Sequence, residues 1–293
     1  MSAVNCDDQR RMSDDDFLDH LRLPGAAGRA LATARRTGDT AAVHRAVAGH
    51  FRTRRTPAWV FYMHGGAWLS ADGRGDVIAK ARNLLRGRFA NCWRPYQTVD
   101  ISRPGGGVDL QAGLRVNGGT IARNTFIPEL TTAFALTGDA AYLRRALELI
   151  RAVEKQMPFM LEPIYHDDND RGFGGPGNSA MDIAYRVYRW LDLMYSGALH
   201  VPGVFSDRDI FRLIWFYTRQ FHRQAGHPLR RDNHHHMDHG HGPWILGLMF
   251  PEFAGARRLR RALDRLPVPH CLPLPPSPGP GLRQRSSAFH AGR

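Results

Sequence analysis

The sequence contains few cysteines, almost no lysine and no long hydrophobic run. Its three cysteines, Cys6, Cys92 and Cys271, form neither a metal-binding spacing nor a disulfide framework, which favours a reducing compartment. No apolar run approaches the roughly 18 residues that a membrane-spanning helix needs, so we expect no membrane span. The first residues lack the apolar core of a secretory signal. We therefore expect a cytoplasmic protein, with secretion as the alternative.

The charge is strongly basic and is carried by arginine. The formal net charge is +13, and only Lys80 and Lys155 among the 40 basic residues are lysines. Such an excess indicates an anionic partner, which could be nucleic acid, a membrane surface or an acidic polysaccharide. A coding bias towards arginine is the alternative explanation. Apolar residues make up 43% of the chain and charged residues 23%, which predicts a folded protein with a buried core.

Hydrophobic periodicity predicts a chain of helices joined by short turns, and short turns imply antiparallel neighbours. About three successive helical hairpins follow residue 121, which is an α/α architecture. Residues 57–75 are mixed, with a β-like run at 59–62, and residues 90–120 are irregular and rich in Gly, Pro and Asn. The predicted helices cover residues 26–52, 76–86, 126–136, 140–157, 179–194, 207–221, 244–250 and 253–266.

A histidine cluster precedes the apolar run at 244–250. Residues 232–241 read DNHHHMDHGH, with five of the chain's 15 histidines. Imidazole exchanges protons near neutral pH and binds metals, so the cluster could be an acid/base site, a metal site or incidental. No His-Glu-x-x-His motif and no cysteine partner occurs, so we expect no metal. The G-x-G-x-x-G match at 172–177 follows loop residues, not a buried strand, so we expect no cofactor.

Five segments match one family pattern in order along the chain. Ala133–Asp139 matches an Ala-Tyr-x-Leu-Thr-Gly-Asp turn, and Asn233-His234 followed by Asp238 resembles an Asn-His-x-x-x-Glu segment. The other three segments are Arg123–Phe126, Met181–Arg186 and the Phe-Pro-Glu-Phe at Phe250–Phe253. Together they resemble the helical toroid domain of the heparinase II/III-like and related alginate lyase families. The segments 49–52 and 86–89 fit the front region of the families more loosely.

The resemblance implies a mostly α fold, an incomplete (α/α) toroid of helical hairpins with an irregular N-terminal section. It divides the chain into a front section at 1–120, a toroid domain at 121–266 and a tail at 267–293. It also implies β-elimination on a uronate-containing acidic polysaccharide, and therefore a glycan partner in place of nucleic acid.

The family's site residues carry over onto matching positions. Asn233 and His234 would neutralise the uronate carboxylate as the enolate-like charge develops, and Asp238 would orient an imidazole. The expected substrate-binding residues are Arg123, Asn124, Arg186 and His239.

The tail departs from the family pattern. Phe289 stands where the family has its acid/base tyrosine, and Gln284 replaces a glutamate. Seven of the 19 prolines fall in 267–281, where a helix cannot continue. We therefore expect a truncated relative or a frame-disturbed tail. The alternatives to a lyase domain are a catalytically inactive carbohydrate-binding or scaffold domain and a metal hydrolase that uses the histidine cluster.

Overall fold

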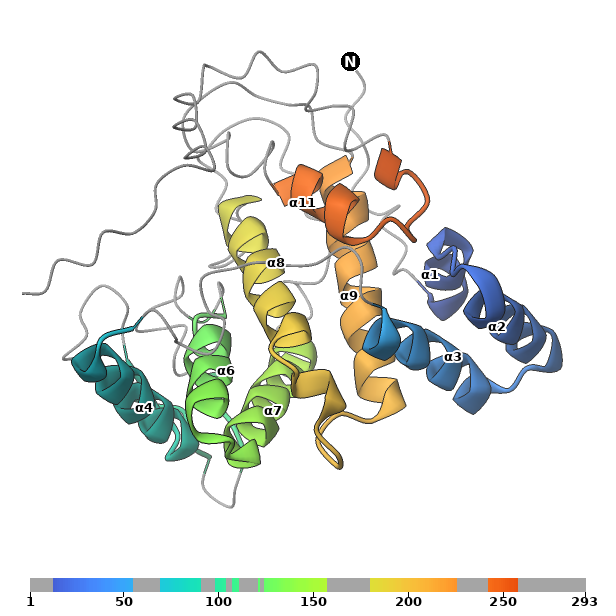
Figure 1. The fold of residues 1–293 in the computed structure, drawn as a ribbon. Helices are drawn as coiled ribbons and strands as arrows, with labels where there is room; N and C mark the ends of the chain where they lie inside the picture. Colours follow the sequence, from blue (N-terminus) through green and yellow to red (C-terminus); the bar gives the residue numbers. More distant parts are fainter. Residues whose placement is uncertain are drawn as a thin grey trace, which may run out of the picture.

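The computed structural model describes residues 13–54, 69–90, 98–103, 107–110, 121, 124–156, 180–225 and 242–257. Within these ranges the chain is mostly helical and has one small antiparallel sheet (Figure 1). None of the helices in the described ranges is both long and apolar enough to cross a membrane. The mostly α fold class predicted from the sequence is confirmed.

Three helices form the N-terminal part: α1 (Asp14–His20), α2 (Gly25–Thr37) and α3 (Thr40–Thr53). Gly38 ends α2 with a φ of 68°, a left-handed conformation that glycine adopts without steric cost. Asp39 then caps α3, and its side chain accepts the backbone N–H of Ala42 at 2.9 Å. The helical stretch predicted over 26–52 is therefore two helices.

Helix α4 (Ala71–Leu85) leads into a small hairpin of β1 (Arg88–Ala90) and β2 (Thr98–Asp100). The helix begins earlier than predicted because Ser70 caps it, with its hydroxyl accepting the Gly73 N–H at 3.2 Å. Gly87 has a φ of 79° between α4 and β1, and a Cβ there would collide with Ser102 Oγ. The prediction of irregular structure over 90–120 is thus wrong for β2. The β-like run at 59–62 lies outside the described residues.

Two of the about three predicted helical hairpins lie within the described residues. Helices α6 (Phe126–Thr137) and α7 (Ala140–Gln156) are joined by a two-residue turn, and α8 (Ala180–Tyr195) leads through the short η4 (Ala198–His200) to α9 (Asp207–Ala225). A capping box opens α9: Asp209 N–H donates to Ser206 Oγ at 3.2 Å, and Ser206 N–H donates to Asp209 Oδ2 at 3.0 Å.

The last described helix is α11 (Gly242–Met249), which corresponds to the helix predicted over 244–250. The helix predicted over 253–266 is described only as far as residue 257: Phe253 lies in a bridge with Leu21, residues 254–255 form a turn, and residues 256–257 are helical. Gly255 has a φ of 87°, which interrupts a regular helix there. The proline-rich segment 267–281 and the rest of the tail lie outside the described residues.

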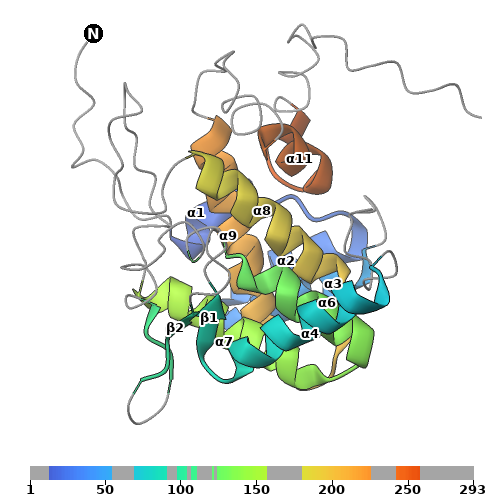
Figure 2. The same ribbon diagram turned by 90° about the vertical axis from the view of Figure 1, so that its left-hand side faces the viewer.

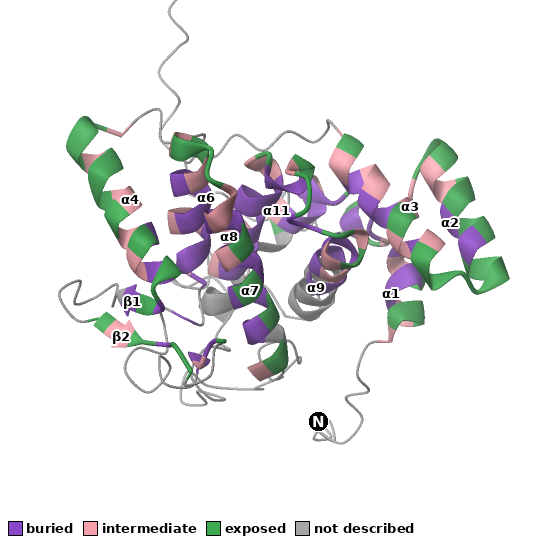
Figure 3. Cartoon of the chain, turned by 90° about the horizontal axis from the view of Figure 1, so that it is seen from below, coloured by how far each residue is buried: buried purple, intermediate pink, exposed green. Residues whose placement is uncertain are grey.

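The helices pack as an incomplete toroid around one hydrophobic core (Figures 1 and 2). Successive hairpins lie beside one another: α3 packs on α2 and α9, α6 packs on α4, α7 and α8, and α11 packs on α8 and α9. Buried residues line the inward faces of these helices (Figure 3). The core is continuous across position 121, since Phe17 of α1 meets Phe211 of α9 edge to face with ring centroids 5.0 Å apart.

The two ends of the described chain are joined directly. Leu21 and Phe253 form an isolated antiparallel bridge, in which Arg22 N–H donates to the Glu252 carbonyl at 2.7 Å and Ala254 N–H donates to the His20 carbonyl at 2.8 Å. These bonds fix the segment after α11 against the end of α1. They therefore hold the C-terminal end of α11 in place relative to the N-terminal helices.

Candidate functional site

Most of the predicted site residues lie outside the described part of the chain. Asn233, His234, Asp238 and His239 belong to the segment 226–241, and Arg123 also falls in a gap. The structure does describe the two helices that flank this segment. Helix α9 ends at its start, α11 begins at its end, and the two helices pack against each other.

Asn124 is described, and it is an interior residue at the start of α6. Its side chain is 0% exposed, and its φ of 53° places it in the left-handed region that asparagine tolerates better than most residues. Its amide Nδ2 donates to the Ile121 carbonyl at 2.7 Å, and its Oδ1 accepts from Trp190 Nε1 at 2.8 Å. The side chain thus ties the entry of α6 to α8. Its role in substrate binding stays a prediction.

Arg186 is described as well, one turn before Trp190 on α8, and it is 0% exposed. Residues four apart lie on the same helix face, so Arg186 and the tryptophan that binds Asn124 share a side of α8. The structure therefore brings two of the predicted residues to one region of the helical core. Contact between Arg186 and an anionic sugar likewise stays a prediction.

A buried polar cluster joins the end of α3 to the Phe250–Phe253 segment. Glu252 is at its centre: His50 Nε2 donates to Oε1 at 2.7 Å, and Arg54 Nη1 donates to Oε2 at 3.0 Å. Arg54 also donates to the Met249 carbonyl at 2.7 Å and to Tyr195 Oη at 3.0 Å. Arg54 and Glu252 have side chains only 4% and 6% exposed. The cluster therefore connects α3, α8 and the end of α11.

The electrostatics of this cluster favour the ionised carboxylate. Burial alone would raise the pKa of Glu252, but the hydrogen bond from His50 and the charge of Arg54 outweigh burial and hold that pKa below its ordinary value. Burial raises the pKa of Tyr195, so its phenol stays protonated beside the guanidinium. Glu252 follows closely after the end of α11 at Met249. Its ion pair with Arg54 therefore fixes α11 at the end opposite to the segment 226–241.

The carboxyl group of Glu129, unlike that of Glu252, has a pKa near neutrality. Burial raises the pKa of Glu129 on α6 to about 7, although the nearby charges of Lys80 and Arg189 oppose the shift. Lys80 itself forms an ion pair with Asp76 at 2.6 Å. A carboxyl group that titrates near pH 7 is often functional, so Glu129 is a candidate that the sequence pattern did not reveal.

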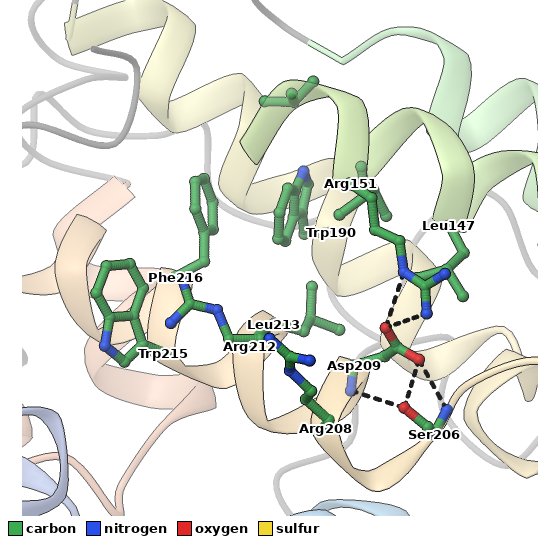
Figure 4. Close-up of a pocket in the computed structure, with 12 residues that line it drawn as sticks. Leu147, Arg151, Trp190, Ser206, Arg208, Asp209, Arg212, Leu213, Trp215 and Phe216 are labelled. Carbon is green, nitrogen blue, oxygen red and sulfur yellow. Dashed lines mark hydrogen bonds and ion pairs between the residues drawn. The ribbon is translucent and has the colours of Figure 1, made fainter. Parts of the chain in front are cut away.

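A cavity of about 530 Å³ lies between α7, α8 and α9 (Figure 4). Its apolar wall is formed by buried aliphatic residues of α7 and α9 and by three aromatic side chains, Trp190, Trp215 and Phe216. The rings of Trp190 and Phe216 stack, with centroids 3.9 Å apart. The volume of this cavity and its mostly apolar, aromatic lining are in the range found for small-molecule binding sites.

Among the described residues, three arginines, one carboxylate and the hydroxyl of Ser206 form the polar part of the cavity. Arg151 of α7 donates two hydrogen bonds to Asp209 Oδ1, at 3.0 and 2.6 Å, and so bridges α7 and α9. Burial alone would raise the pKa of Asp209, but hydrogen bonds from Ser206 and Arg151 lower it below the ordinary value. Arg208 and Arg212 follow on α9. The sequence did contain a signal for them, because positions 208, 212 and 215 share one helix face.

Comparison with solved structures identifies the fold. The chain is similar to the heparan sulfate lyase HepC from Pedobacter heparinus, with a TM-score of 0.62 and 18% identity over 84% of this chain and 37% of that one. A mutant of that lyase gives a TM-score of 0.64 at 16% identity over 85% of this chain and 38% of that one. Heparinase III gives 0.61 at 14% identity over 84% of this chain and 36% of that one.

The chain therefore has a heparinase-like helical fold and spans little more than a third of the length of these neighbours. No family model matches the sequence, and no curated protein matches it. Among the described residues, no group of three or more His, Cys, Asp or Glu side chains is arranged to hold a metal ion. The histidines of 234–241 lie outside that part of the chain.

Proposed function

We propose that this chain is a polysaccharide lyase-type domain that acts on uronate-containing acidic polysaccharide by β-elimination. The observation that carries the proposal is the likeness of its helical fold to heparan sulfate lyases over 84% of the chain. The Asn233-His234 pair and the net charge of +13 support the same chemistry and the same anionic partner.

The reaction requires removal of a weakly acidic proton. The C5 proton of a uronate is a poor acid while the neighbouring carboxylate carries its full charge. Asn233 can donate a hydrogen bond from its amide to that carboxylate, and the imidazole of His234 can add a second donor. Both contacts strengthen as negative charge develops in the transition state, which is how preorganised donors accelerate a reaction. Asp238 would orient an imidazole, because a carboxylate that accepts a hydrogen bond from one ring nitrogen fixes the position of the ring and its tautomer.

Elimination also needs a base at C5 and an acid at the leaving O4. Phe289 occupies the position of the tyrosine in the resemblance, and a phenyl ring exchanges no proton. A binding domain without turnover is therefore the second candidate function. The phenylalanine at this position is the observation that favours it.

Turnover of defined glycans tests the proposal. Heparan sulfate, alginate and polygalacturonate are incubated with the full chain, and the ultraviolet absorbance of the unsaturated uronate product is followed. We expect product from at least one glycan and a loss of about a hundredfold or more in His234→Ala or Asn233→Ala, the usual cost of removing an oxyanion donor. His200→Ala, at an exposed histidine of η4, is the matched control.

Two results contradict the lyase proposal. One is binding of a glycan without product, which selects the inactive binding domain. The other is full turnover by both His234→Ala and Asn233→Ala, which removes the assigned donors from the reaction. Normal thermal melting of each variant ensures that a loss of activity is not a loss of fold.

A further inference from the structure

The C-terminal ends of three helices meet at the side chain of Arg54. Arg54 follows the last residue of α3, and its own N–H donates to the His50 carbonyl at 2.8 Å. Its guanidinium donates to the carbonyl of Met249, the last residue of α11, at 2.7 Å, and to Oη of Tyr195, the last residue of α8, at 3.0 Å. The last carbonyls of a helix lack partners within that helix, so the Met249 carbonyl finds a donor in Arg54. One side chain therefore joins the ends of α3, α8 and α11.

We propose that Arg54 is a positioning residue for the elimination reaction: its guanidinium sets the position of α11, the helix that follows Asn233 and His234 in the chain. The inference rests on the proposed function, because it takes these two residues as the donors to the uronate carboxylate. Arg54 itself is only 4% exposed, so its side chain is out of reach of a polymer. It would act through α11, which runs from Gly242 to Met249.

Apolar packing alone specifies the rotation of α11 only weakly. The helix packs on α8 and α9 and buries Leu246 and Met249, and burial of apolar surface is non-directional. A hydrogen bond depends on distance and angle, so the bond from Arg54 to the Met249 carbonyl fixes the rotation and the axial position of the helix at that end. A helix of eight residues is about 12 Å long and moves as one body. A displacement at Met249 therefore reaches Gly242 and the segment before it.

The contacts of Arg54 require a guanidinium and not merely a positive charge. Glu252 accepts from Arg54 at 3.0 Å, and the rings of Phe51 and Phe250 lie with their centroids 4.7 and 5.2 Å from the central carbon of the guanidinium. A planar fork of donors serves several acceptors at once, whereas the ammonium group of lysine is a compact point charge. In Arg54→Lys the charge beside Glu252 is thus kept, but the full set of bonds to α8 and α11 is not.

A second arginine of α3 provides the matched control. Arg52 donates to the carbonyls of Leu199 and Phe205, at 3.2 and 2.9 Å, and forms an ion pair with Asp207. These partners belong to η4, to the start of α9 and to the turn between them. Arg52→Lys therefore disturbs a comparable set of bonds on the same helix at a place away from α11.

Steady-state kinetics of the full chain test the proposal on the glycan that the parent cleaves. We expect Arg54→Lys to lower kcat about a hundredfold with little change in KM, because a misplacement of about 1 Å at the reacting groups costs a factor of that size and leaves the rest of the binding surface intact. Arg52→Lys should retain the kcat of the parent. Both variants are assayed at a temperature where their melting curves show them folded. Parental kcat in Arg54→Lys, or equal losses in the two variants, would overturn the proposal.

Fluorine NMR of Trp244 supplies a readout that needs no turnover. Trp244 lies on α11 and is 38% exposed. The full chain is labelled with 5-fluorotryptophan, and the Trp244 resonance is assigned with Trp244→Phe. We expect this resonance to shift in Arg54→Lys and to stay in place in Arg52→Lys. An unshifted resonance in Arg54→Lys would overturn the proposal. Equal shifts of the Trp190 and Trp215 resonances would indicate a general loosening of the core, and would overturn it as well.

The two measurements separate this inference from the lyase proposal. If no glycan yields product, the catalytic proposal is removed, and the Trp244 resonance alone decides whether Arg54 positions α11. If the parent forms product while Arg54→Lys keeps both its kcat and its Trp244 resonance, the lyase stands and the role of Arg54 is removed.

Discussion

Neutralising Glu252 tests whether its buried ion pair holds the helical core together. Arg54 and Glu252 are 4% and 6% exposed, and Arg54 also lies against three aromatic rings, those of Phe51, Tyr195 and Phe250. In Glu252→Gln the shape is kept, but the guanidinium remains buried without its counter-charge. Breaking a buried pair in this way costs about 3–5 kcal/mol, and we expect the low end because the amide oxygen still accepts a hydrogen bond.

The same pair predicts a pH dependence with a defined sign. The pKa of Glu252 is lower in the folded protein than its ordinary value, so its contribution is fully present above the unfolded pKa. It is lost as the pH falls through the folded pKa. The stability difference between the parent chain and Glu252→Gln should therefore be constant near neutrality and shrink below about pH 4, where an unfolded glutamate protonates.

Thermal and urea unfolding measure the effect. The matched control is Arg45→Gln, which removes one partner of an exposed ion pair with Asp39, 3.6 Å long and 59% and 50% exposed. That change should cost less than about 1 kcal/mol. A double variant, Arg54→Met with Glu252→Gln, should recover part of the loss, because no unpaired buried charge remains. A loss in Glu252→Gln no larger than in the control, or one that persists unchanged at low pH, would refute the reasoning.

Substitutions at three further positions probe single side chains. Asn124→Gly should lower the free energy of unfolding by about 1–3 kcal/mol, because it removes the hydrogen bond from Trp190. Asn124→Ala should lose about 1 kcal/mol more in calorimetry, because alanine is strained at the φ of 53° and glycine is not. Equal losses in the two variants would contradict this. Ser206→Ala should cost about 1 kcal/mol in urea unfolding and Ser206→Thr much less, as expected for a cap. The melting temperature of Glu129→Gln should rise relative to that of the parent chain as the pH increases from about 4 to about 7. The reason is that the raised folded pKa of about 7 makes the ionised carboxylate destabilising in the parent. A melting temperature that falls further below the parent's over this range would refute the prediction.

The sequence could predict the helices wherever local chemistry alone decides them. Ser206 and Asp209 lie three residues apart before an apolar stripe, and that spacing is sufficient for a capping box. Gly138 and Asp139 similarly end α6 and start α7. The hairpin of β1 and β2 was missed because three-residue strands carry almost no periodic signal.

Burial and partnership were decided by the tertiary structure. His50 and Glu252 are 202 positions apart in the chain, and nothing in either segment indicates that the histidine donates to that carboxylate. The family resemblance alone predicts Asn124 and Arg186 as substrate-binding residues, and the tertiary structure shows that both are interior residues. The cavity required α7, α8 and α9 to be placed together before its arginines could be recognised as neighbours.

The sequence by itself thus determined most of the helical segments, the turn between α6 and α7 and the charge of the molecule, because capping and periodicity act over a few residues. Only the packing of the helices decided which polar groups lose their water and which find a partner. Those outcomes depend on contacts between segments far apart in the chain, where local composition holds no information.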